Sequence, residues 1–315
     1  MRESLFIKKN LSRWKQYQEE PTDDPDEMAE RFVSVLDDLS YAKTFYSFSK
    51  VTRYINGIAA GIYHRIYQNR KEEVGRFQLF FKYEQPLLFR RYHRLLLFTL
   101  CFFLLFCVIG AFSSAHDATF VRGVLGDEYV NMTERNIANH DPFGVYKDGN
   151  PVLMFFRIAT NNIQVSFYCY VGGIFLGIGS LYLLIRNGVM LGVFQYLFFA
   201  HGLGWKSVLV IWIHGTLEIS SIVIAACAGV IMGKSILFPG TRKRLEALRE
   251  GAKDGIKIMV TLVPVFRGAA VREIVVSRQT EMPLVLSLFI LLSSLSFILG
   301  YFIFYPIYLH NKGYR

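Results

Sequence analysis

SVLVIWIHGTLEISSIVIAACAGVIM, from Ser207 to Met232, has the length and the apolar character of a helix that crosses a lipid bilayer. Two ionisable residues interrupt this stretch near its middle. His214 and Glu218 are four residues apart, so on a helix they share one face. A charged side chain at the centre of a spanning helix costs about 2.5–3.5 kcal/mol on insertion scales, and such side chains are retained where they face protein or water. We therefore expect this helix at the centre of a bundle, with a polar face turned inward.

Composition places the chain among polytopic membrane proteins. Its 315 residues are 52% hydrophobic with a mean hydropathy of +0.30, and several apolar runs exceed the length of a soluble core helix. We attribute the formal net charge of +10 to a cytoplasmic excess of Lys and Arg, because no basic nucleic-acid-binding module is present. The four cysteines lack CxxC spacing and lie in apolar runs, which argues against a disulfide framework and a zinc site.

The sequence predicts four regions: one before the first long apolar run, the run itself, a polar loop after it, and the remaining apolar part of the chain. Residues 1–93 are predicted to form a cytoplasmic or interfacial region of three or four helices. Residues 94–112 form the first transmembrane helix, and the arginines just before it place that end in the cytoplasm. Residues 113–151 are acidic and poor in Lys and Arg, which is typical of an extracytoplasmic loop. Residues 152–315 form the main transmembrane helix bundle.

Two features of the N-terminal region predict helices. Asp24 and Asp26 flank Pro25, which is typical of a helix start. Residues 86–94 mix Phe and Leu with Arg and His, and two interpretations of this segment stay open. It forms either a helix at the boundary of the lipid headgroups, with proline in its first turn, or part of a solvated helical hairpin.

We expect the main bundle to contribute five further crossings, which gives about six in all. These are residues 164–185, 189–200, 207–232, 256–276 and 284–309. Residues 152–160 and the basic stretch 241–255 are predicted to form amphipathic helices at the membrane surface. Pro264 is expected to kink its helix. Because Lys and Arg then concentrate on one side, both termini are predicted to be cytoplasmic.

Polar and small residues of this bundle form three predicted sets. The first is a buried polar seam, whose members are His214, Glu218, Arg267 and Glu273. The second lies at the predicted helix mouths, where side chains cap helices or line a path, and consists of Asn161, Asn162, Arg186 and Asn187. The third is a set of glycines that let helices approach closely. It comprises Gly172, Gly173, Gly177, Gly188, Gly192, Gly215 and Gly229.

Three interpretations of His214 and Glu218 stay open. They form a hydrogen bond between helices that fixes register, they relay protons or ions along a transport path, or they bind a metal with a third ligand such as His201. Arg267 either pairs with Glu218 across the bundle or extends to the interface. No G-x-S-x-G, P-loop or H-E-x-x-H motif is present, so we expect neither an enzyme nor a bound metal or cofactor.

The chain resembles the stage II sporulation protein M family of bacterial and archaeal membrane proteins over nearly its whole length. HGTLE at residues 214–218, followed by small residues up to Gly229, resembles the HGxxE element of that family, and residues 161–192 are similar too. The N-terminal sequence resembles members found outside spore-formers. The resemblance implies a multi-pass protein of the bacterial inner membrane and the cell envelope, and the family name is not evidence of a role in sporulation.

Three hypotheses on function follow, of which the third, a membrane-embedded hydrolase, would need a metal or a nucleophile beside His214. The first is a scaffold that anchors or organises an envelope-associated protein complex. The second is a transporter, channel or lipid-handling protein that uses the polar face of His214 and Glu218. A water-accessible cavity that reaches Glu218 favours transport, whereas a dry, fully paired seam favours the scaffold.

The expected partners are the lipid bilayer and other membrane or envelope proteins. The resemblance implies RDD-type membrane proteins, MoxR-type ATPases and von Willebrand factor A-like proteins as partners. No nucleic acid is expected, and a homo-oligomer stays open.

Overall fold

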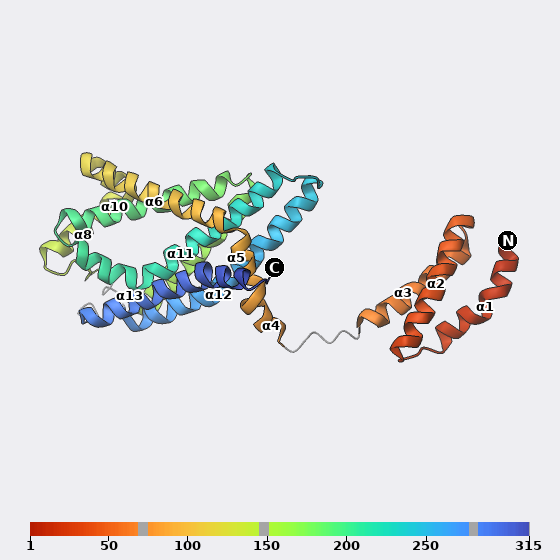
Figure 1. The fold of residues 1–315 in the computed structure, drawn as a ribbon. Helices are drawn as coiled ribbons and strands as arrows, with labels where there is room; N and C mark the ends of the chain where they lie inside the picture. Colours follow the sequence, from red (N-terminus) through yellow and green to blue (C-terminus); the bar gives the residue numbers. More distant parts are fainter. Residues whose placement is uncertain (69–74, 145–150, 277–282, 315) are drawn as a thin grey trace. The chain divides into compact units, whose positions relative to one another are not determined.

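The computed structural model describes residues 1–68, 75–144, 151–276 and 283–314, and every regular element in these ranges is a helix (Figure 1). The all-α class is therefore confirmed for these ranges. The helices belong to two compact units, Met1–Phe77 and Gln78–Arg315. Each unit has its own buried apolar core.

The N-terminal unit packs its helices around an aromatic core. Its helices are α1 (Glu3–Glu19), α2 (Pro25–Phe45) and α3 (Lys50–Gln68). Trp14 of α1 is fully buried, and its Nε1 donates a hydrogen bond to Oδ2 of Asp38 on α2 at 2.7 Å. The guanidinium of Arg13 reaches the same oxygen at 2.6 Å. These contacts fix how α1 lies against α2. An N-terminal helical region is confirmed, but its compact unit ends at Phe77 and not at residue 93 as predicted.

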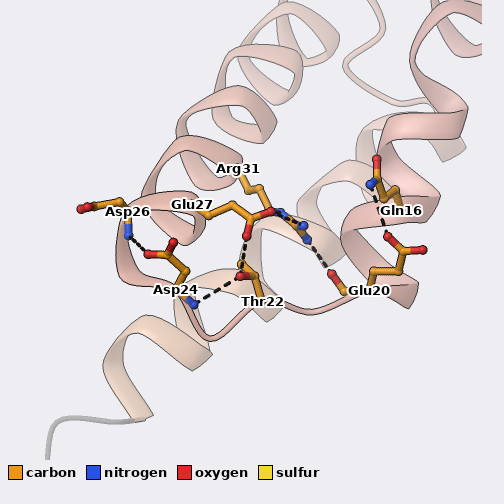
Figure 2. Close-up of polar contacts among 7 residues, drawn as sticks. All are labelled: Gln16, Glu20, Thr22, Asp24, Asp26, Glu27 and Arg31. Atoms are coloured by element: carbon orange, nitrogen blue, oxygen red, sulfur yellow. Dashed lines mark hydrogen bonds and ion pairs between the residues drawn. The ribbon is translucent and has the colours of Figure 1, made fainter.

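The turn between α1 and α2 shows why α2 begins where it does (Figure 2). Asp24 is the N-cap, its Oδ1 accepts a hydrogen bond from the backbone N–H of Asp26 at 3.0 Å, and Pro25 occupies the first turn. The predicted helix start is thus confirmed. Glu27 accepts hydrogen bonds from the Thr22 hydroxyl at 2.6 Å and from Nε of Arg31 at 3.0 Å. These two bonds lower the pKa of the Glu27 carboxyl below its usual value.

The second unit is a bundle of long helices joined by short segments. The long helices are α6 (His93–His116), α9 (Pro151–Val171), α10 (Ile178–Ala200), α11 (Gly204–Leu237), α12 (Arg244–Val276) and α13 (Leu284–Leu299). The short segments that precede or join them are α4 (Arg76–Leu79), η1 (Phe80–Glu84), α5 (Gln85–Arg91), α7 (Ala118–Leu125), α8 (Asp127–Ala138), η3 (Gly172–Ile174), η4 (Gly300–Phe304) and α14 (Tyr305–Asn311).

Four of the described helical stretches are long and apolar enough to cross a membrane. They are His93–His116, Ile178–Ala200, Gly215–Leu237 and Leu284–Asn311. The prediction of a multi-pass membrane protein is confirmed at this level. α9 and α12 are outside this set, although both pack along α11 in the same bundle. The expected total of six crossings therefore stays a prediction.

α11 lies at the centre of the membrane unit. It packs against α6, α9, α10, α12 and α13, and its contact with α12 is the most extensive in the bundle (Figure 1). From Ile222 to Met232 its side chains are buried, apart from the half-buried Val230. The central position predicted from the apolar stretch of α11 is confirmed.

The boundaries predicted for the second and third crossings are wrong. Residues 164–185 are not one helix, because α9 ends at Val171 and the 3-10 turn η3 follows. Gly177 then adopts a left-handed conformation with φ +84°, which costs a residue with a side chain about 1–2 kcal/mol. α10 begins after this turn and has 23 residues. The short crossing expected at residues 189–200 is therefore the second half of a full-length helix.

Two helices predicted to lie separately on the membrane surface are parts of longer helices. Residues 152–160 form the first half of α9, and residues 244–255 continue without a break into the rest of α12, which contains Pro264. Gly255 lets the basic part of α12 approach α9 closely. A Cβ at this position would lie 2.5 Å from Cε2 of Tyr170 on α9. The basic start of α12 therefore packs closely on α9 instead of lying apart from the bundle.

Candidate functional site

A cavity of about 410 Å³ lies where α6, α9, α10 and α11 meet the short helices α7 and α8. Its polar lining consists of Tyr129, Asn161, Asn162, Asn187 and Glu218. Its apolar lining consists of Phe103, Val124, Leu125, Met190, Leu191, Phe194, Ile211, Ile219 and Ile222. Small-molecule sites are typically about 300–1,000 Å³ in volume, with mostly apolar walls and a few polar groups. The cavity has both properties.

Glu218 supplies the acidic group of this cavity. It is 8% exposed and belongs to the candidate span Gly215–Leu237 of α11. A carboxylate at this depth loses most of its hydration, so it requires a polar or water-accessible surrounding. The cavity wall gives Glu218 such a surrounding inside the bundle.

Three asparagine amides border the same cavity. Asn161 and Asn162 lie in the middle of α9, and Asn187 lies in the middle of α10. Nδ2 of Asn187 donates to the carbonyl oxygen of Leu183 in its own helix at 2.8 Å. The side-chain amides of Asn161 and Asn162 form no hydrogen bond with another described residue. Amide groups are thus available to a ligand as donors and as acceptors.

The positions of these asparagines correct the sequence analysis. All three were expected at helix mouths, but the break after Val171 moves the helix ends away from them. Arg186, expected beside Asn187 at the inner end of a crossing, also lies in the middle of α10 and is exposed. Neighbouring residues of a helix point in directions about 100° apart, so Asn187 borders the cavity and Arg186 does not.

Gly215 has a different place from the one predicted for it. It was expected to pack against another helix, but it lines the cavity. The nearest atom to a Cβ built there is Cδ1 of Ile219 in the same helix, at 3.5 Å. The missing side chain of Gly215 therefore contributes open volume next to Glu218.

The predicted polar seam is not reproduced as a whole. Arg267 is exposed, because Leu262, Val265 and Ala269 form the buried face of α12 and Arg267 points to another side. His214 and Glu273 belong to α11 and α12, but their side chains lie outside the described residues. Among the residues that are described, Glu218 is the member of the seam that lines the cavity. The described residues contain no cluster of three His, Cys, Asp or Glu residues able to hold a metal.

The model of the stage II sporulation protein M family matches residues 99–278, which is more than half of the chain. The chain belongs to this family. The resemblance seen in the HGTLE element is thereby confirmed. A second family model, a domain of unknown function (DUF8413), matches residues 4–68, which lie in the N-terminal unit. No curated protein and no solved structure matches the chain.

The stage II sporulation protein M region contains the whole cavity. Every lining residue, from Phe103 to Ile222, lies between residues 99 and 278. α13 and α14 follow this region, and α1 to α3 precede it. The candidate site is therefore a feature of the part of the chain that carries the family match.

The family region also contains the closest helix contacts of the bundle. A Cβ at Gly173 would lie 2.6 Å from Cα of Gly229, and one at Gly229 would lie 2.9 Å from the carbonyl oxygen of Tyr170. On α10, a Cβ at Gly188 would lie 2.9 Å from the carbonyl oxygen of Phe103 in α6. At these distances only glycine fits without a shift of the backbone. Gly172 and Gly192 are confined in the same way, against Gly179 and Cys107.

Sequence reasoning missed two kinds of residue in this family member. Gly233 is one, since its Cβ would lie 2.5 Å from Cα of Gly177, and its spacing of four from Gly229 is the small-xxx-small signal that could have revealed it. Val124, Leu125 and Tyr129 of α7 and α8 are the others. They follow the first crossing in a segment interpreted as a polar loop, and no sequence signal placed them against α10 and α11.

Proposed function

We propose that the membrane unit binds a small cationic or hydrogen-bonding solute in the cavity beside Glu218 and moves it across the bilayer as a transporter or channel. The observation that supports this proposal is the cavity itself, in which one carboxylate and three amides meet, with Glu218 and Asn187 inside candidate spans. An ionisable residue inside a membrane bundle is a functional-site hypothesis by default, because its burial is expensive. A cavity next to that residue is what transport requires and what a scaffold does not need.

The lining selects the chemistry of the solute. Glu218 attracts a positive charge, and the asparagine amides hydrogen-bond to polar groups in either direction. The apolar walls, with Phe103, Phe194 and Ile219 among them, favour a solute that also has an apolar part. We therefore propose a small amphiphilic cation or a hydrated ion as the ligand class. The proposal includes no enzymatic step.

Cysteine labelling tests the cavity directly. Met190 lines the cavity, so in a chain without its native cysteines Met190→Cys should react with water-soluble methanethiosulfonates. A permanently cationic reagent should react more than about a hundredfold faster than its sulfonate counterpart. At an effective dielectric of about 20, a unit charge roughly 10 Å from Glu218 is attracted by about 1.7 kcal/mol if it is positive and repelled by about as much if it is negative. Glu218→Gln should remove this preference.

Two matched controls accompany the labelling. Glu128→Gln makes the same change at an exposed position of α8 outside the lining and should leave the preference unchanged. Leu104→Cys places a thiol on the exposed apolar surface of the α6 span, where a water-soluble reagent should react slowly. An unreactive Met190→Cys variant, or equal rates for both reagents, would contradict the proposal.

Flux measurements test transport itself. Liposomes that contain the purified protein and an enclosed pH or cation indicator should show a voltage-driven flux, and Glu218→Gln should abolish it while the protein stays folded. Cavity labelling without any flux would support a binding site and count against transport.

A second candidate is the scaffold that anchors an envelope-associated complex. It is favoured by the N-terminal unit, which has its own core and leaves Val33 and Leu36 of α2 exposed on neighbouring turns. Purification from native membranes in mild detergent should then retain partner proteins, and deletion of residues 1–68 should release them. Partners of the RDD-type, MoxR-type and von Willebrand factor A-like classes are the ones that the resemblance implies.

Six crossings with both termini in the cytoplasm of a bacterial inner membrane remain the topology that we propose. It is supported by α9 and α12, which pack along α11 in the same bundle as the four candidate spans. Two further crossings bring the total to six, and an even number of crossings places both termini on one side. Reporter fusions at the two ends and at residues 126 and 202 should report the ends inside and these turns outside. Termini on opposite sides would contradict this topology.

A further inference from the structure

A second, larger pocket lies in the membrane unit at the corner between α5 and α6. Its volume is about 940 Å³, and it also borders α12 and the end of α14. Its charged lining residues are Glu84, Arg90, Arg91, Arg94, Asp254 and Lys257. None of them lines the cavity beside Glu218, so the two sites are separate.

The pocket has an excess of positive charge that its own carboxylates do not balance. Nη1 of Arg91 lies 3.3 Å from Oδ2 of Asp254, and Nζ of Lys257 lies 3.4 Å from Oε2 of Glu84. Each carboxylate of the lining thus has its own cation.

The remaining two cations of the lining are Arg90 and Arg94. Neither forms an ion pair with any residue in the described part of the chain. Among the described residues, the side chain of Arg90 has one hydrogen-bond partner, Nδ1 of His93 at 3.4 Å, and its buried Nε has none. The pocket therefore presents two uncompensated guanidinium groups, which suits a phosphate group with one or two negative charges.

Hydrogen bonds between distant parts of the chain hold this pocket in shape. Nε2 of the fully buried Gln85 donates to the carbonyl oxygen of Lys257 at 2.7 Å, and the Tyr92 hydroxyl donates to Asp254 at 2.6 Å. Burial, followed by the bond to Asp254, raises the pKa of the Tyr92 hydroxyl above its usual value. The ring of Phe89 meets that of Phe302 edge to face at 4.8 Å. A ligand would thus meet a site that is already formed.

The pocket lies at the ends of two candidate spans. His93 begins the span of α6, and the last span ends at Asn311, next to His310 of the lining. One turn along α6 from Arg94, the exposed side chains of Leu97 (61%) and Phe98 (44%) begin the apolar surface of that span. A cationic pocket therefore continues directly into an apolar surface of the kind that acyl chains cover.

We propose that this pocket binds the phosphate of an anionic phospholipid, with Arg90 and Arg94 as the groups that recognise it and the acyl chains along Leu97 and Phe98. A soluble phosphate compound has the same charge as the headgroup, but it has no acyl chains that would cover the adjoining apolar surface. Charge complementarity and the continuous apolar face together support the lipid as the occupant.

Native mass spectrometry of the full-length protein in mild detergent tests this proposal. Phosphatidylglycerol should bind more tightly than phosphatidylcholine with the same acyl chains. Arg90→Gln with Arg94→Gln should weaken phosphatidylglycerol binding about thirtyfold, because each basic residue near an anionic headgroup contributes about fivefold, the equivalent of about 1 kcal/mol. Phosphatidylcholine binding should stay unchanged.

Three further variants keep the test decisive. Arg94→Gln alone removes an exposed side chain, should fold normally and should weaken binding about fivefold. Arg90→Lys with Arg94→Lys keeps both charges and should retain most of the binding. Lys243→Gln with Arg244→Gln removes two exposed cations outside the pocket and should have no effect.

Several outcomes would overturn the proposal. An equal loss with the Lys243 and Arg244 pair would show general attraction to basic surface. Equal affinity for the two lipids would remove the charge argument. Inorganic phosphate that competes as strongly as phosphatidylglycerol would assign the pocket to a soluble anion.

Discussion

The two halves of α11 meet their neighbours in opposite ways. Around Gly215 and Glu218 the neighbouring helices stand back and leave a cavity, whereas from Gly229 to Gly233 they approach to backbone contact. Within a membrane, apolar surface gains little by leaving lipid, so close packing holds helices together. The tightly packed half is thus suited to hold the bundle, and the open half is suited to admit a ligand.

The largest effect is expected where α11 is most tightly packed. Gly229→Leu should destabilise the bundle by about 3 kcal/mol or more, because its side chain would collide with the backbone of α9 and with Ser180. Thermal unfolding in detergent and the yield of monodisperse protein measure this loss. Gly268→Leu on α12, where a Cβ meets nothing within 4 Å, is the matched control and should be tolerated. A normally stable Gly229→Leu protein would break the comparison.

An intermediate effect is expected at the turn that brings α9 and α10 against the packed half. Gly177→Ala should cost about 1–2 kcal/mol, because a side chain disfavours the left-handed backbone conformation at φ +84°. Its thermal unfolding temperature should fall below that of Gly123→Ala, a change in α7 at a glycine without positive φ and with open space around it. Equal unfolding temperatures would mean that this turn is not under the constraint that we infer.

The smallest effect on stability is expected at the cavity. Gly215→Leu should change the free energy of unfolding by less than about 1 kcal/mol, since better helix propensity offsets the crowding and the side chain enters open volume. It should nevertheless slow labelling of Met190→Cys by filling the space beside Glu218. Together with Gly229→Leu, this variant makes the same substitution twice on one helix. Similar losses of stability at both positions would contradict the difference between the halves.

Much of the fold could be predicted from local patterns. The apolar length of α11, the cap formed by Asp24 before Pro25 and the HGTLE element each depend on a few neighbouring residues, and each led to a correct inference. The ends of α9 and α10 could not be predicted in this way. Residues 172–178, which form the turn at Gly177, are all apolar or glycine, so no polar loop marks the break between the two helices.

The candidate site was predictable in its residues but not in its arrangement. Glu218, Asn161, Asn162 and Asn187 stand out in the sequence because polar side chains in apolar runs are costly. Arg267 stood out for the same reason, yet it faces away from the core of α12. Cost alone does not say which way a helix is rotated, and the rotation depends on what the neighbouring helices present.

The sequence by itself determined the class of the protein, its family and the central position of α11, because length, hydropathy and short motifs are local properties of the chain. The tertiary structure alone decided that Glu218 and three asparagines meet at one cavity, and that Gly229 and Gly233 lie against other backbones. These features depend on the distances between helices, which are set jointly by side chains far apart in the chain.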